Sequence, residues 1–175
     1  MRVVKWILVV VGGLAAVFFV GAALITPTYK VERSTTINAP AAKVYPLVAD
    51  PRAWKRWAVW DLREPDMKVA YSGAPAGQGA KWAWDSKEGK GSMEFTAAVP
   101  DQSLAYRLTF VDMNMVSTGA FTFTPAGNAT RVSWTNEGDV GKNPMMRWFV
   151  PFLDRMMGPD FAAGLANLKA LAEKP

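Results

Sequence analysis

The sequence contains neither cysteine nor histidine, and these two absences exclude much of the chemistry that a 175-residue chain could perform. Without cysteine there can be no disulfide framework, thiolate nucleophile, iron–sulfur site or lipoprotein anchor. Without histidine the chain lacks the commonest general base, the Ser-His-Asp triad and any zinc site with imidazole ligands. We therefore assign no catalytic residue, no metal site and no cofactor from the sequence.

An excess of charge of one sign is also missing. The chain has 20 basic and 15 acidic residues, which are interspersed, so the formal net charge is only +5. A nucleic-acid-binding domain needs a concentrated basic stripe, and we therefore predict no nucleic-acid partner. Half of the residues are hydrophobic, and the length suits one ordinary domain with an appendage.

The stretch from Trp6 to Ile25 contains no charged residue. Twenty helical residues span about 30 Å, which is close to the thickness of the hydrocarbon core of a bilayer. We predict that residues 1–27 form a transmembrane anchor in which residues 6–25 cross the membrane. The alternative is a cleaved signal peptide, with Gly21-Ala22-Ala23 as a small-residue cleavage site.

The few charges around this stretch predict its orientation. Arg2 and Lys5 precede it, and positively charged residues favour the cytoplasmic side of a membrane. We therefore place the N-terminus in the cytoplasm and the single-pass anchor in the inner (cytoplasmic) membrane. Residues 28–175 then form a domain on the periplasmic, extracytoplasmic side.

The pattern of residues 28–175 predicts an α+β domain. Residues 30–37 are typical of a strand, and we expect two short helices at 41–48 and 52–57. Over residues 67–134 apolar residues alternate with polar ones in runs separated by turn residues, which indicates six further strands. Strands joined by hairpins form an antiparallel sheet, and its apolar face needs a cover.

A long amphipathic helix near the C-terminus is the expected cover. Asn143-Pro144 is typical of a helix start, with Asn as the N-cap and Pro at the first helical position. Apolar residues then recur at helical spacing as far as Ala172. We expect Gly158-Pro159 to interrupt this helix.

Several motifs occur in an order that resembles a known superfamily. They are Val31-Glu32-Arg33-Ser34 followed by Ile37-Asn38-Ala39-Pro40, the tryptophans of WKRWAVW (Trp54, Trp57 and Trp60), Gly77-Gln78-Gly79-Ala80, and the ending GPDFAAGLANLKALAE. From Lys30 to Glu173 the chain thus resembles the polyketide cyclase/dehydrase and lipid-transfer branch of the START-like (SRPBCC) superfamily. The resemblance implies a helix-grip fold, in which a curved antiparallel sheet wraps around a long C-terminal helix and encloses a hydrophobic cavity. Members bind lipids, sterols, polyketides or other apolar molecules, and a minority are enzymes.

The alternating strand residues define one apolar face that we predict to line such a cavity. This face is rich in aromatic rings and broad for a sheet that a single helix covers. The alternative is that its side chains simply fill the core, as the inner face of any sheet does. The predicted lining consists of Trp82, Trp84, Met93, Phe95, Tyr106, Leu108, Phe110, Phe121, Phe123, Val132 and Trp134, facing Phe161 and Leu165 on the helix.

Polar residues are rare on this face. Tyr106 is the candidate for orienting the polar end of a ligand, because a buried phenol needs a hydrogen-bond partner. The alternative is that its hydroxyl reaches water at the mouth of the cavity. We interpret Asp112 as a turn residue, and Arg33 as an edge residue that reaches solvent.

Two further aromatic groups are candidates for contact with a membrane surface. The tryptophans of WKRWAVW stand beside basic residues, and Trp148, Phe149 and Phe152 form the second group. We interpret the first group as a cap on the end of the sheet, because the resemblance accounts for these tryptophans structurally. The second group receives the same interpretation.

These observations favour a membrane-anchored binding protein for a hydrophobic small molecule, either a lipid or a polyketide-like compound. One alternative is a cyclase, dehydratase or hydrolase that relies on Asp112, the tyrosines and oriented water. The other is a protein-interaction module of the cell envelope with no ligand and an unknown protein partner.

Overall fold

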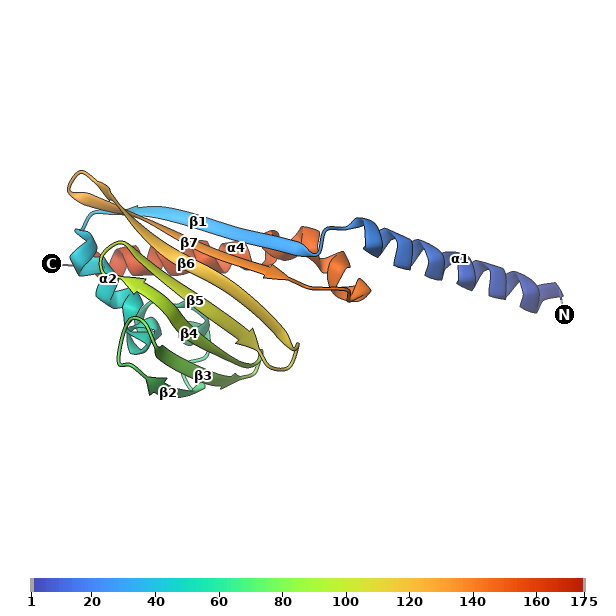
Figure 1. Cartoon of the computed structure of the whole chain (residues 1–175), viewed down its shortest axis with the longest axis horizontal. Helices are drawn as coiled ribbons and strands as arrows, with labels where there is room; N and C mark the ends of the chain where they lie inside the picture. Colours follow the sequence, from blue (N-terminus) through green and yellow to red (C-terminus); the bar gives the residue numbers. More distant parts are fainter. Residues whose placement is uncertain (1, 175) are drawn as a thin grey trace.

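The computed structural model describes residues 2–174 and contains a seven-stranded antiparallel sheet (Figure 1). The strands are β1 (Thr28–Ile37), β2 (Lys68–Gly73), β3 (Ala80–Ser86), β4 (Gly89–Val99), β5 (Ser103–Phe110), β6 (Met115–Ala126) and β7 (Ala129–Asp139). Their order in the sheet is β1-β7-β6-β5-β4-β3-β2. Strands β2 to β7 therefore follow one another as hairpins, and the six strands predicted over residues 67–134 are confirmed.

The first strand joins the sheet beside the last one. All ten residues of β1 pair with β7, from Thr28 opposite Asp139 to Ile37 opposite Thr130. In β4 the register shifts between Phe95 and Ala97, which is a β-bulge. Bulges increase the bend and twist of a strand, so this one favours the curvature of the sheet.

The helices are α1 (Arg2–Leu24), α2 (Ala41–Ala49), the 3-10 helix η1 (Pro51–Arg56), α3 (Val59–Arg63) and α4 (Pro144–Ala172). Figure 1 shows α4 running along the sheet close to β1 and β7, with α2 at the end that holds the C-terminus. The α+β architecture expected from the sequence, an antiparallel sheet with a long C-terminal helix, is confirmed. The sequence predicted two short helices, whereas the structure has three, because α3 is a single five-residue turn without a side-chain cap.

Helix α4 is continuous, although we expected Gly158-Pro159 to break it. Its start is as predicted, because the Asn143 side chain accepts hydrogen bonds from the backbone N–H groups of Met145 and Met146 at 3.0 and 3.3 Å. Gly158 has a packing role, since a Cβ atom there would lie 1.9 Å from the Arg33 guanidinium. Burial of the following turns on the sheet keeps the helix intact around Pro159.

Helix α1 extends away from the sheet (Figure 1). Within residues 2–174 it is the one helix long and apolar enough to cross a membrane, with a mean hydropathy of 2.7. Its length and composition are also compatible with a signal sequence near the N-terminus.

Candidate ligand site on the inner face of the sheet

The inner face of the sheet is built around stacked aromatic rings from three elements. The indole of Trp134 on β7 stacks on Phe161 of α4, with ring centroids 4.1 Å apart and planes 16° apart. On its other side it stacks on Phe121 of β6, with centroids 4.8 Å apart. Helix α4 is therefore fastened to β7, and through Trp134 to β6, by ring stacking.

Trp54 of η1 and Trp57, which directly follows η1, enter the same cluster. Trp54 meets Trp82 at a centroid distance of 5.1 Å, and Trp57 meets Trp134 at 5.7 Å. Their indole N–H groups donate to the carbonyls of Val48 and Leu47 on α2. We expected these residues to cap the end of the sheet; both indoles are buried in the cluster, where α2 supplies the acceptors that they require.

All thirteen residues predicted to line a cavity belong to this one cluster. Eleven of them are buried, and Trp84 and Phe110 are half-buried. The last two lie in one row across the sheet, because Gly91 pairs with both Trp84 and Phe110. A Cβ atom at Gly91 would lie 2.2 Å from the Trp84 ring, so the indole lies across this glycine.

Some of the partly exposed apolar residues packed on the cluster lie in this row, and others lie on α4. Phe110 pairs with Met115 at the start of β6, so the row continues to the connection between β5 and β6. In the first half of α4, Val150, Leu153 and Met157 pack against the cluster without being fully covered. We call the following set the apolar rim: Trp84, Phe110, Met115, Val150, Leu153 and Met157.

A polar network lies within the apolar face, centred on Tyr106. Its hydroxyl donates to the Thr135 carbonyl at 2.7 Å and accepts from the Trp134 indole at 3.0 Å and the Asn136 amide at 3.3 Å. One donor and two acceptor positions are all that a phenol offers. We expected this hydroxyl to orient a ligand or to reach water, but the chain itself satisfies it.

The network continues toward β1 and β6. Asn136 also donates to the hydroxyl of Ser117 at 3.1 Å and accepts from Tyr29 at 3.4 Å. Burial raises the pKa of the Tyr106 phenol well above its ordinary value, and it raises that of Tyr29 in the same direction. Both phenols therefore stay protonated at neutral pH, so neither serves as a general base there.

Arg33 lies on the edge strand β1 and is partly exposed, as expected, but it also has a charged partner. Its guanidinium forms two hydrogen bonds with the Asp154 carboxylate on α4, at 2.8 and 3.0 Å. This contact holds the pKa of Asp154 below its ordinary value. The arginine therefore joins β1 to α4, in a place that Gly158 leaves free.

Asp112 lies in the connection between β5 and β6, as predicted for a turn residue. Its carboxylate accepts a hydrogen bond from the Lys90 backbone N–H at 2.7 Å. The carboxylate thus links two neighbouring hairpins. Among residues 2–174 no group of three acidic side chains is arranged to hold a metal ion.

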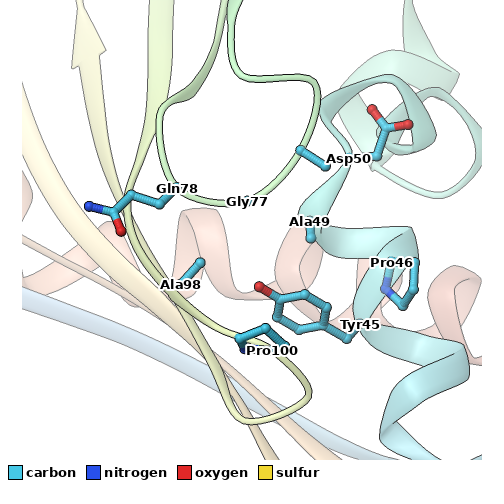
Figure 2. A pocket seen from close by; sticks show the side chains of 9 residues that line it. Tyr45, Pro46, Ala49, Asp50, Gly77, Gln78, Ala98 and Pro100 are labelled. Atoms are coloured by element: carbon cyan, nitrogen blue, oxygen red, sulfur yellow. The ribbon is translucent and has the colours of Figure 1, made fainter.

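Two hollows lie at the surface, away from the predicted lining residues. One, of about 630 Å³, lies between α2, the β2–β3 loop and the end of β4, and Figure 2 shows Tyr45 at its centre. Its acidic residue, Asp50, already accepts from the Arg52 backbone N–H. The other, of about 600 Å³, is lined by residues 28–30, 116–118 and 137–139. Neither has the aromatic lining typical of an apolar ligand site.

Residues 28–173 match the family model described as "Polyketide cyclase / dehydrase and lipid transport". No match was found among curated proteins. Solved structures share the fold at low sequence identity. Truncated norcoclaurine synthase from Thalictrum flavum has a TM-score of 0.65 and 14% identity, over 87% of this chain and 98% of that one. Protein CV1439 from Chromobacterium violaceum has a TM-score of 0.62 and 18% identity, over 83% and 98%. The helix-grip fold implied by the sequence resemblance is confirmed.

Proposed function

Because this chain belongs to the polyketide cyclase/dehydrase and lipid transport family, we propose that it is a membrane-attached domain that binds a hydrophobic small molecule between the sheet and α4. The apolar rim carries this proposal. There the aromatic inner face reaches the surface, with Trp84 and Phe110 half-buried while the other predicted lining residues are buried. An apolar ligand is bound chiefly through the apolar area that it removes from water, and this end of the face still has such area to offer.

The chemistry of the site supports binding in preference to catalysis. Tyr106 has used its hydrogen-bonding capacity inside the chain, and Asp112 is engaged by a backbone N–H group. The rim itself consists of apolar side chains, so it offers a ligand contact area and few directional bonds. We therefore propose selection by shape and apolarity, with a lipid or a polyketide-like compound as ligand.

The membrane attachment is proposed on the properties of α1. Its first two turns contain Arg2 and Lys5, it is uncharged from Trp6 onward, and three residues connect it to β1. By the positive-inside rule the domain lies on the extracytoplasmic side of the inner membrane. Alkaline phosphatase fused after residue 175 is expected to be active in living bacteria, and activity only of a cytoplasmic reporter would contradict this orientation.

Photo-crosslinking of the full-length chain in nanodiscs tests the ligand site. The probe is palmitic acid with a diazirine on its chain, and mass spectrometry maps the labelled peptides. We expect labels on residues 84–93, 108–116 and 150–157, which contain the rim. Labelling confined to α1 would contradict the proposal, because that pattern indicates a probe dissolved in the lipid alone.

Matched variants make this test specific. Phe110→Asp places a charge in the rim, and Val99→Asp places the same charge at an exposed site at the end of β4. Each methylene group of the ligand that is buried contributes about 0.8 kcal/mol to the free energy of binding. If the variant prevents the burial of two of them, the affinity falls about tenfold. We expect rim labelling to fall by about that factor for Phe110→Asp and to stay unchanged for Val99→Asp. Equal labelling in both variants, with circular dichroism unchanged, would refute the rim as the site.

A further inference from the structure

The first half of α4 carries large apolar side chains on its outer side. They are 38% to 60% exposed in a chain whose other large exposed apolar residues lie mostly on α1. At about 100° per residue they fall within an arc of about 100° on the helix surface. This stripe, called here the outer α4 face, consists of Met145, Trp148, Phe149, Phe152 and Met156.

The outer α4 face begins in direct contact with α1. The Trp148 indole stacks on Phe18 with centroids 6.2 Å apart, and its N–H donates to the Phe18 carbonyl at 3.3 Å. The ring lies on Gly21, where a Cβ atom would be only 2.6 Å away. The apolar surface of α1 and that of α4 are therefore continuous at this point.

Arg147 joins the same two helices through their polar groups. Its guanidinium donates to the carbonyls of Ala22 and Ala23 at 3.4 Å each, and also to the Gly141 carbonyl at 2.9 Å. The last carbonyls of a helix have no partner within it, and α1 has no basic residue in its own last turn. A residue of α4 thus caps the end of α1 and fixes where α4 begins.

This junction determines what the outer α4 face meets when α1 crosses a bilayer. Trp148 contacts α1 within its last two turns, inside the stretch that spans the hydrocarbon core. The start of α4 must then lie at the level of the lipid, beside α1. Residues 142–153 contain no acidic residue, so no carboxylate would have to lose its hydration where this segment meets the lipid.

We propose that the outer α4 face docks on the same bilayer that α1 spans, with its aromatic rings among the lipid chains and headgroups. This inference rests on the membrane attachment proposed above and is independent of any bound ligand. Amphipathic helices bury their apolar face about 5–10 Å into the boundary between headgroups and acyl chains. Met145 and Phe149, next to the α1 contact, lie deepest, and Met156 lies nearest to water.

The absence of cysteine makes a direct test simple, because each single-cysteine variant carries one label. Full-length chains with Phe149→Cys, Phe152→Cys, Val10→Cys or Gln102→Cys are labelled with nitrobenzoxadiazole. They are placed one per nanodisc in phosphatidylcholine with phosphatidylglycerol, with or without lipids brominated near the carbonyl end. Val10 lies within α1, and Gln102 is an exposed residue in the β4–β5 turn.

We expect a blue shift and bromine quenching at positions 149 and 152, quenching at position 10, and neither effect at position 102. Quenching at 10 without any at 149 and 152 would overturn the docking while leaving the anchor intact. Absence of quenching at position 10 would overturn the anchor and the docking together. A blue shift at 149 and 152 that occurs only in discs holding two chains would also overturn the docking, since it indicates an interface between copies.

Discussion

The two halves of α4 differ in what surrounds them, although they form one continuous helix. In residues 158–172 the large apolar side chains, such as Phe161 and Leu165, are buried on the sheet, and the exposed positions carry mostly alanine. In residues 144–157 large apolar side chains lie on both sides of the helix. Both halves are rich in apolar residues, so hydrophobicity alone does not decide which side chains are buried. The halves also differ in their neighbours, because only the first half lies beside α1.

The two halves should differ most in how much one alanine substitution in each lowers the free energy of unfolding. Phe161→Ala removes a ring that stacks on Trp134 and should lower the free energy of unfolding by about 3–5 kcal/mol. Phe152→Ala, on the exposed side of the first half, should change it by less than about 0.5 kcal/mol. Urea denaturation of the full chain in detergent micelles measures both. Equal costs would show that the two halves are packed alike.

A smaller loss of stability is expected when the polar network under the second half of α4 is disturbed. Tyr106→Phe leaves the Trp134 indole N–H without its acceptor and weakens the position of the ring on which Phe161 stacks. Because the unpaired groups are buried, we expect a loss of about 1–3 kcal/mol in the same denaturation experiment. The control is Tyr71→Phe, at a half-buried tyrosine outside the network. A neutral Tyr106→Phe variant would mean that water replaces the hydroxyl.

The junction with α1 is tested by adding side chains at two glycines. Gly21→Leu forces the Trp148 ring off α1, whereas a Cβ atom added at Gly12 has no atom within 4 Å, so Gly12→Leu is the control. We expect faster amide hydrogen exchange over residues 144–150 for Gly21→Leu only, with the second half of α4 unchanged. Hydrogen-exchange mass spectrometry on the full chain gives both readings. Identical exchange in the two variants would argue against a fixed junction.

The smallest expected effect concerns acid stability. Arg33 lowers the pKa of Asp154, so the folded chain binds this proton less readily than the unfolded chain. The stabilisation is then present above the ordinary carboxyl pKa near 4 and is lost as the pH falls through the lower folded value. Asp154→Asn should therefore flatten the acid dependence of unfolding below about pH 4. Asp66→Asn, at an exposed residue before β2, should leave that dependence unchanged.

The strands and the inner face could be predicted from the sequence because alternation directly reports which side of a strand is apolar. Trp82, Trp134 and Phe121 share the face that their spacing indicates, and Asn143 caps the helix as its type suggests. These features are local. A pattern within a few residues is enough to specify each of them.

The features that were missed depend on partners far away in the chain. From the sequence alone, Gly158 predicts a helix break; in the structure it makes room for Arg33 of β1. From the sequence alone, the Tyr106 hydroxyl is expected to be free; in the structure it forms hydrogen bonds with Trp134, Thr135 and Asn136. Single-sequence patterns indicate which face a residue occupies, but they do not indicate what lies opposite it.

The pairing of β1 with β7 has a consequence for how the chain is made. Synthesis proceeds from the N-terminus, so α1 and β1 emerge first, and β1 must wait until every other strand has been produced. During that interval its backbone groups form an open edge. Arg147, which completes the end of α1, is translated later still. Ribosome stalling before β7 should therefore leave a nascent chain that is prone to aggregation, and release of the last forty-odd residues should remove that hazard.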